Sequence, residues 1–359
     1  MSATSISSRS PSLRVGFLAL TDAAPLIVAQ QRGLFTQHGL RVTLEREVGW
    51  ATIREKILYG EIDAAHAPAP MLWSARLGLG CAQQPVLTSF VFNLHGNALT
   101  LSNRLYAEGV RDAASLRSIA KSRRGENRLT LGVVFPFSSH HLHLRQWLER
   151  GGIRPDVDVR IAIVPPAQMF RNLEAGTIDG YCAGEPWNTL AVRAGVGWCP
   201  MWSATHAPGH VEKVLMVTER VAKARASEHR ALIRALSAAA RWCDEPDSHE
   251  QLARVLGAAE FLNLPARAIR PALTGRFDCG HERVENVPDF MVFHRHEANV
   301  PSLDRAVSLQ RQLIVAGLLP EDVDPELPRQ VFREDLYRDA LNDHSAGAAS
   351  LPSIRGVSV

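Results

Sequence analysis

Three polar or aromatic side chains stand where a small ligand could be held, each beside an expected helix start or strand. Trp50 lies just before Thr52, which begins a capping box with Glu55, so the Trp50 ring is expected at a helix N-terminus, where free backbone N–H groups favour anions. His140 follows two serines at another helix start, and Lys213 precedes an apolar strand. Each also has an ordinary explanation: Trp50 as a core anchor, His140 as a capped surface residue and Lys213 as a surface lysine.

The histidines near the second helix start lack the spacing of a metal site. His140, His141 and His143 form a cluster, but a helix brings together residues four apart, and position 144 is leucine. We therefore expect His141 and His143 on a solvated helix face, and neither a metal nor another cofactor.

Composition and motifs disfavour several function classes. The chain contains no G-x-S-x-G, no phosphate-binding glycine loop, no HExxH and no dinucleotide fingerprint, so the common enzyme chemistries are not indicated. Its 359 residues are 46% hydrophobic and 21% charged with a formal net charge of +3, which is typical of a soluble globular protein without a nucleic-acid patch. The five cysteines are odd in number and show no CxxC, which predicts neither a disulfide framework nor a structural zinc site.

The elements that position these side chains follow a plan that is written twice. The frame Gly-x-Ile-Asp-x-x-x-Ala-x-x-Pro occurs at 60–70 and again at 176–186. Each copy follows a strand-helix-strand-helix series, which predicts a mostly parallel sheet. The expected strands span 13–20, 40–47, 129–135 and 157–164, and the expected helices span 24–32, 52–59, 138–152 and 167–175. Coincidence between two ordinary turns is the alternative, but five matched positions in one frame favour two α/β lobes built alike.

Two facing α/β lobes would enclose a cleft, and such sheets bind ligands beyond their strand ends. The tract from about residue 219 has no third copy of the frame and is expected to wrap back over the first lobe as helices. The predicted lobe I spans 13–105 and about 216–340, and the predicted lobe II spans 106–215. Residues 1–12 and 343–359 are expected to be flexible tails.

Four motifs resemble one known family, in order along the chain. They read LRVGFLALTDAAPLIVAQQRGLF, GWATIREKILYGEIDAAHAPAPM, NLHGNALTLSN and CAGEPWN. Over residues 13 to about 340 the chain resembles the nitrate- and bicarbonate-binding receptors of ABC transporters, the NrtA/CmpA family. The resemblance implies a class II, periplasmic-binding-protein-like α/β fold with mixed sheets, flanking helices and a ligand cleft between two lobes. Carried over by motif, the nitrate-binding residues are Trp50, Asn97, His140, Gly184 and Lys213.

The resemblance also implies a biological role. Secreted members of the family begin with an export signal, and the polar start of this sequence does not look like one. The chain is therefore similar to the cytoplasmic nitrate/nitrite sensors of the NasS type. Such a sensor implies that the anion releases an RNA-binding antiterminator partner of the NasT type, which controls nitrate assimilation genes, without direct contact to nucleic acid or membrane. The alternative is the substrate-binding component of an ABC transporter for nitrate, nitrite or bicarbonate. An enzyme on this fold, as in the thiamin-pyrimidine synthases, is not expected.

Nitrate accepts hydrogen bonds through three oxygens and donates none, so we expect its site to offer donors only. The expected donors are the Lys213 ammonium, a His140 N–H, the Asn97 amide and the Gly184 backbone N–H, with Trp50 against the flat face of the ion. A buried carboxylate aimed at the ligand would repel nitrate. Bicarbonate has an O–H that can donate a hydrogen bond, so an acceptor in the site would favour bicarbonate. Glu185 is the acidic residue nearest the expected pocket, and we expect it to turn away.

Overall fold

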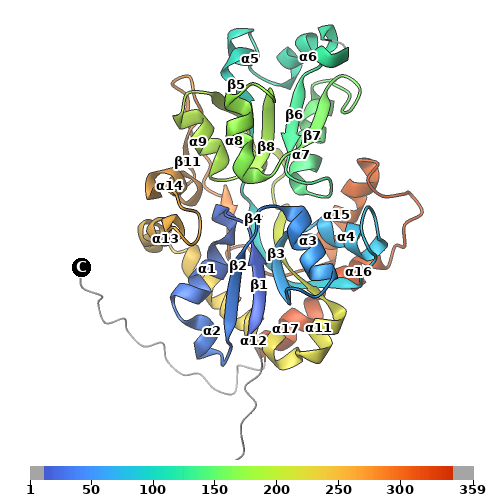
Figure 1. Cartoon of the computed structure of the whole chain (residues 1–359), viewed down its shortest axis with the longest axis vertical. Helices are drawn as coiled ribbons and strands as arrows, with labels where there is room; N and C mark the ends of the chain where they lie inside the picture. The colour runs from blue at the N-terminus through green and yellow to red at the C-terminus, as the bar shows by residue number, and fades with distance from the viewer. Residues whose placement is uncertain (1–11, 124, 343–359) are drawn as a thin grey trace, which may run out of the picture.

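Two α/β bodies, each with its own sheet, make up the molecule in Figure 1. The computed structural model describes residues 12–123 and 125–342. We call the two bodies lobe I (residues 13–95 and 211–342) and lobe II (residues 97–206). The prediction of two lobes with mixed sheets and flanking helices is confirmed, and both predicted tails lie outside the described residues, apart from residue 12.

Lobe I is built on a mixed sheet of six strands. They are β1 (Leu13–Phe17), β2 (Val42–Arg46), β3 (Ala64–Pro68), β4 (Val86–His95), β10 (Val211–Thr218) and β13 (Met291–Val292). Their order is β13-β4-β10-β3-β1-β2, with β1 parallel to β2 and β3, and β10 antiparallel to both β3 and β4. Strands β3, β4 and β10 are buried along their whole length, as expected of strands that are covered on both faces.

The helices of lobe I pack through apolar stripes. In α12 (Ala226–Cys243), for example, Leu232, Leu236 and Ala239 recur at helical spacing and are buried. The remaining helical segments are η1 (Thr21–Ala23), α1 (Ala24–Gln31), α2 (Leu34–Gln37), α3 (Trp50–Leu58), α4 (Met71–Leu77), α11 (Glu219–Ala224), η3 (Pro246–Ser248), α13 (His249–Gly257), α14 (Ala266–Thr274), α15 (Leu303–Val315), α16 (Leu327–Val331) and α17 (Glu334–Asn342).

Lobe II repeats the arrangement on a five-stranded sheet. Its strands are β5 (Asn97–Ser102), β6 (Thr130–Val133), β7 (Arg160–Ile163), β8 (Gly180–Gly184) and β9 (Gly197–Trp202). They lie in the order β7-β6-β8-β5-β9, with β6 parallel to β7 and β8, and β5 antiparallel to β8 and β9. The helical segments are α5 (Asn103–Ala107), α6 (Ala113–Ser122), η2 (Gly125–Asn127), α7 (Ser139–Arg150), α8 (Pro166–Glu174), α9 (Trp187–Arg193) and α10 (Ser203–His206).

The repeated frame performs the same task in each lobe. The Asp63 carboxylate accepts the backbone N–H of Arg14 at 2.9 Å, and the Asp63 N–H donates to the Arg14 carbonyl at 2.9 Å. In lobe II, Asp179 forms the same pair of bonds with Thr130, at 2.8 and 2.7 Å. Each aspartate therefore fastens the start of its strand to the neighbouring parallel strand. We call this pair of bonds the aspartate clasp.

The chain crosses between the lobes at two places. Strand β4 ends at His95 and β5 begins at Asn97, so Gly96, with φ at 102°, makes the first crossing. The chain returns between α10 and β10. The sequence predicts these boundaries at 105 and 215, several residues later, because local patterns do not reveal which sheet a strand joins.

The tract after residue 219 packs on lobe I, where α12 lies against α1 and α17, but it also reaches lobe II. The hairpin of β11 (Arg276–Asp278) and β12 (Val284–Asn286) leads to Cys279, whose carbonyl accepts the N–H of Cys199 at 2.9 Å. The Trp202 ring of lobe II stacks on Phe277, with ring centroids 4.2 Å apart. The tract after residue 219 therefore packs on lobe I and also contacts lobe II.

The aspartate clasp predicts a stability cost that depends on the chemistry of the side chain. We expect Asp63→Ala and Asp179→Ala each to lower the free energy of unfolding by about 1–3 kcal/mol, because each leaves a strand N–H without its acceptor. Asparagine keeps one acceptor oxygen, so Asp63→Asn and Asp179→Asn should lose less. Urea unfolding midpoints measure the difference. Asp322→Ala is the control, because Asp322 is exposed in the loop before α16. Alanine variants that unfold at the wild-type midpoint would contradict the clasp.

Candidate functional site

The five residues predicted from the sequence converge between the lobes. Trp50 begins α3 and Lys213 lies in β10, both in lobe I. Asn97 begins β5, Gly184 ends β8 and His140 lies in the first turn of α7, all in lobe II. Side chains of both lobes also share one apolar core, so the lobes are packed against each other in this structure.

Lys213 is fully buried and is paired with two buried carboxylates. Its Nζ lies 2.9 Å from Asp22 Oδ2 and contacts Glu212 Oε1. Burial alone would lower the pKa of Lys213, but Asp22 and Glu212 outweigh it and raise that pKa. Burial likewise opposes ionisation of the carboxyls, and Lys213 reverses this, so the pKa of Asp22 is lowered and that of Glu212 lies well below its usual value. All three groups are therefore charged at neutral pH.

A local irregularity of β10 lets two neighbouring side chains meet. Successive side chains of a regular strand point to opposite faces, which would separate Glu212 from Lys213. The pairing of β10 with β4 shifts register on both sides of Lys213, as in a β-bulge. The two side chains consequently lie close enough for an ion pair.

Glu212 links the lobes. Its Oε2 accepts Asn97 Nδ2 at 2.6 Å and also the hydroxyl of Ser139, both from lobe II. His140 Nε2 lies 3.6 Å from Glu212 Oε1. Burial lowers the pKa of His140 to about 4 against the opposing pull of Glu212, so its ring is neutral at pH 7 and carries one N–H.

Gly184 keeps space open beside these groups. It pairs with Asn97 across β8 and β5, and a Cβ atom on Gly184 would lie 3.5 Å from Asp22 Oδ2 and 3.6 Å from Asn97 Oδ1. Any side chain longer than a methyl group would enter the space between the two oxygens.

Trp50 forms one wall. Lys213 Nζ lies 5.5 Å from the centroid of the indole, within reach of a cation–π interaction. His66, from β3, stands between Trp50 and the carboxylate of Asp22, with its Nε2 3.2 Å from Oδ1.

Helix α3 begins at Trp50 with Gly49 as N-cap and no side-chain cap, so the predicted start at the Thr52 capping box is wrong by one half-turn. The glycine N-cap leaves no sequence signal of that kind.

Several unmet hydrogen-bonding groups surround Lys213. Within the described part of the chain, Trp50 Nε1, both ring nitrogens of His140, Thr21 Oγ1 and Asn97 Oδ1 are buried and have no hydrogen-bond partner. Buried polar groups are nearly always paired in folded proteins. Such a concentration of unpaired groups is typical of a ligand site.

Two acidic residues correct the expectation of a site with donors only. Asp22 and Glu212 both lie at the centre of the site, and both are nearer to it than Glu185, which sequence reasoning named. Glu185 instead accepts the backbone N–H of Thr189 at 3.3 Å. The expectation considered only the donors that nitrate needs. A buried ammonium such as that of Lys213 also requires counter-charges, and Asp22 and Glu212 provide them.

The histidines of α7 are also placed differently from the prediction. His141 and His143 are buried, not solvated, because the first turns of α7 are inserted beside the other lobe. His141 Nδ1 bonds to the Pro136 carbonyl at 2.7 Å. The ring of His143 lies 4.2 Å from that of His210, centroid to centroid. The periodic pattern of a helix sequence predicts which face is buried. It does not predict that every face of the first turns is buried against other parts of the protein.

The residues that sequence reasoning missed did leave a signal. Asp22 is the one charged residue between Val15 and Ala29, His66 interrupts the small apolar residues of β3, and Glu212 and Lys213 are the two charged residues of β10. A charged or polar residue in a segment that is buried requires a partner. All three missed residues could therefore have been selected as candidates.

Comparisons with known proteins agree with this architecture. A model of the NMT1-like family matches residues 7–257. The chain is 30% identical to the nitrate/nitrite binding protein NrtA of Nostoc sp. PCC 7120 over 355 residues, which cover 96% of this chain and 80% of that protein. It is 40% identical to the bicarbonate transport ATP-binding protein CmpC of Synechocystis sp. PCC 6803 over 253 residues, which cover 70% of this chain and 38% of that protein. The chain spans about half the length, or less, of the ATP-binding relatives that it matches.

The fold has a close counterpart among solved structures. The crystal structure of the periplasmic nitrate-binding protein NrtA from Synechocystis PCC 6803 matches with a TM-score of 0.89 at 27% identity, covering 94% of this chain and 89% of that one. The chain therefore has the two-lobed periplasmic-binding-protein-like fold. Among residues 12–123 and 125–342, no helix is both long and apolar enough to cross a bilayer.

Glu185 makes stability depend on pH. Burial raises the pKa of Glu185 to about 7, although the bonds from Thr189 oppose the shift. Between its ordinary pKa and this value the folded protein holds a proton that the unfolded chain has lost, so this contribution to stability falls as pH rises through that window. We expect Glu185→Gln to reduce the loss of stability between about pH 5 and about pH 8 by up to about 3 kcal/mol. Urea unfolding at each pH measures it, and parallel profiles for both proteins would contradict the assignment.

Proposed function

Because the chain belongs to the NMT1-like family, we propose that it binds nitrate or nitrite between its two lobes. The observation that carries the proposal is the set of buried, unpaired donors around Lys213. A buried N–H without an acceptor costs free energy, and a small oxyanion offers acceptors in several directions at once. Lys213 provides the positive charge, and Trp50 Nε1 and an N–H of His140 are the further donors.

Glu212 does not exclude an anion, because donors already satisfy it, whereas both oxygens of Asp22 are buried without a hydrogen-bond partner among the described residues and are balanced only by the charge of Lys213. Asn97 and Ser139 donate to Glu212, and Lys213 pairs with both carboxylates. Three N–H groups project from an ammonium, so Lys213 keeps one donor beyond these two pairs. Asp22 and Glu212 would still repel an ion placed against them. The anion is therefore best held on the side of Trp50 and His140.

Bicarbonate is the competing ligand. It carries an O–H that can donate a hydrogen bond to Asp22 or Glu212, whereas nitrate has no hydrogen to donate to these oxygens. The relatives include both a nitrate/nitrite binding protein and a bicarbonate transport protein. We give nitrate and nitrite precedence because the solved structure with the TM-score of 0.89 is that of a nitrate-binding protein.

The same comparisons bear on the partner of the bound form. Two relatives are named as nitrate import and bicarbonate transport ATP-binding proteins, which favours a role as the substrate-binding component of an ABC transporter. The sequence prediction of a cytoplasmic sensor with a NasT-like partner is the second candidate. Both roles need the lobes to close on the ion, because a ligand shifts a conformational equilibrium only by its difference in affinity for the two states. The bond from the Thr21 N–H to the Glu185 carbonyl, 2.9 Å across the lobes, is of the kind that closure forms.

Anion binding is tested by calorimetric titration with nitrate, nitrite and bicarbonate. We expect Trp50→Phe, which removes the indole N–H and keeps an aromatic wall, to weaken nitrate binding roughly tenfold. Lys213→Met should weaken it by about 2 kcal/mol or more, through loss of the charged donor. Trp198→Phe is the matched control, because the Trp198 Nε1 is also buried without a partner within the described residues but lies at β9, away from the cleft. Wild-type protein that binds none of the three ions, or equal affinity in Trp50→Phe and Trp198→Phe, would refute the proposal.

The two roles differ in where the protein works and what it holds. If it serves a transporter, fractionation of native cells should place it outside the cytoplasm or at the membrane, and nitrate should increase its binding to the permease. If it is a sensor, it should be cytosolic, and nitrate should release an RNA-binding partner from it. A cytosolic protein whose partner is released by nitrate would overturn the transport role, and a permease-bound protein would overturn the sensor role.

A further inference from the structure

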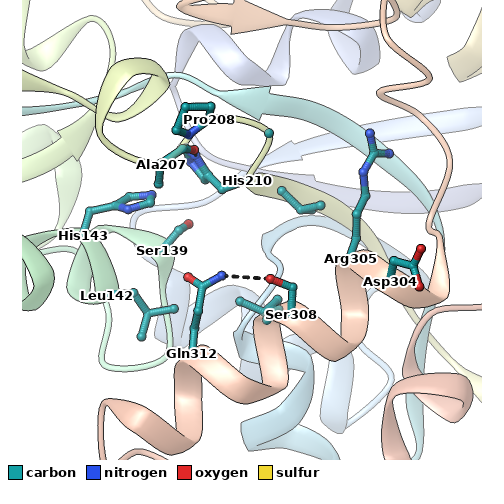
Figure 2. A pocket seen from close by; sticks show the side chains of 13 residues that line it. Ser139, Leu142, His143, Ala207, Pro208, His210, Asp304, Arg305, Ser308 and Gln312 are labelled. Atoms are coloured by element: carbon teal, nitrogen blue, oxygen red, sulfur yellow. Dashed lines mark hydrogen bonds between the residues drawn. The ribbon is translucent and has the colours of Figure 1, made fainter.

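A second cluster of potential ligands stands beside the anion site, on the other side of Glu212. The ligand atoms of His143, His210 and Glu212 all lie within 4.8 Å of one another. They come from α7, from the segment before β10 and from β10 itself, and in Figure 2 the rings of His143 and His210 lie next to each other at one wall of a cavity. Neither histidine has a role in the proposed anion site.

Both imidazoles have nitrogens free to coordinate. His143 is 1% exposed, and neither of its ring nitrogens has a hydrogen-bond partner in the described part of the chain. His210 Nδ1 lies 2.9 Å from the Ala207 carbonyl, which can only accept, so Nδ1 carries the hydrogen. That bond leaves the lone pair of His210 on Nε2, which faces Glu212 Oε2 at 3.4 Å. Backbone bonds of this type orient metal-binding histidines.

The geometry suits a tetrahedral ion. Zn²⁺ binds imidazole nitrogen and carboxylate oxygen at roughly 2.0–2.2 Å, so two ligand atoms on one tetrahedral ion lie about 3.4 Å apart. The distance between His210 Nε2 and Glu212 Oε2 has this value. A lone pair facing a carboxylate is unfavourable, and either a second proton on the His210 ring or a metal cation between the two groups removes the repulsion.

The cavity provides the fourth position. It has a volume of about 270 Å³ and is lined by Ser139, His143 and His210 on one side and by Ser308 and Gln312 of α15 on the other (Figure 2). Arg305 also borders it, but its guanidinium donates to the carbonyls of Glu297 and Val300, each at 2.8 Å, and so is held by the backbone. Water or a small ligand can therefore reach an ion from the side of His143 and His210, which line the cavity, whereas Glu212 lies behind them.

We propose that His143, His210 and Glu212 bind a divalent transition-metal ion, for which Zn²⁺ is the best match, with the fourth position open to the cavity. Helical spacing could not reveal this site, because only one of its ligands lies on α7. The proposal does not depend on the proposed anion function, although the two sites share Glu212.

Zinc binding is tested on the full chain, freed of affinity tags and stripped of metal by a chelator. We expect titration with ZnCl₂ alone to show one bound ion per chain, and His143→Gln or His210→Gln to weaken binding about tenfold or more. His141→Gln is the matched control: His141 is a buried histidine on the same helix, and its Nδ1 bonds to the Pro136 carbonyl outside the cluster. Wild-type protein that binds no zinc, or binding that is equal in all four proteins, would overturn the site.

Cobalt gives a second readout on the unaltered chain, in case the variants fail to fold. Tetrahedral Co²⁺ with imidazole and carboxylate ligands should absorb in the visible range. An intense near-ultraviolet band from thiolate ligands would instead assign the metal to cysteines and overturn the proposal. Nitrate titration of the metal-free chain is a separate measurement, so either proposal can fail while the other holds.

Discussion

A buried ammonium group with a carboxylate on either side is the interaction on which the rest of the site depends. Lys213 could not stay charged away from water without Asp22 and Glu212. Glu212 in turn needs donors, and Asn97 and Ser139 supply them from the other lobe. The charge pairing of lobe I is therefore completed by lobe II. The same few atoms form the proposed anion site and hold the two lobes together, so a substitution that alters one of these two properties also alters the other.

The repeated frame shows how much of the fold could be predicted from sequence. Asp63 and Asp179 stand at equal places in two strand-helix series, and in the structure they make the same backbone bonds. The repeat is visible in the sequence because its five matched positions all lie within residues 60–70 and 176–186. The bonds themselves reach Arg14 and Thr130, each 49 residues earlier in the chain, and only the structure shows them. The assignment of strands to sheets is likewise not visible in local patterns. Strand β5 joins lobe II through its pairing with β8 and β9, and those partners lie far along the chain.

The residues of the candidate site likewise fall into those that could be predicted from the sequence and those that could not. Trp50, His140 and Lys213 could be selected from their positions at helix starts and beside an apolar strand, and Asn97 and Gly184 from the family motifs. The charge of Glu212 in a buried strand marks it as a candidate, but periodicity alone would not place it beside Lys213, because a regular strand would turn the two side chains apart and only the bulge in β10 brings them together. The burial of His143 was not predicted for a related reason. It comes from packing against residues outside α7, such as His210, and not from the pattern of α7 itself.

The two chain crossings adjoin the groups of the proposed anion site. Gly96 is followed at once by Asn97, and the return segment runs directly into Glu212 and Lys213. Side chains along a strand alternate between its faces, so a one-residue slip reverses every one of them. An insertion or deletion of a single residue at either joint would thus turn the amide or the carboxylate to the back of its sheet. The spacing of these joints, as well as the residue types beside them, defines what the protein can recognise.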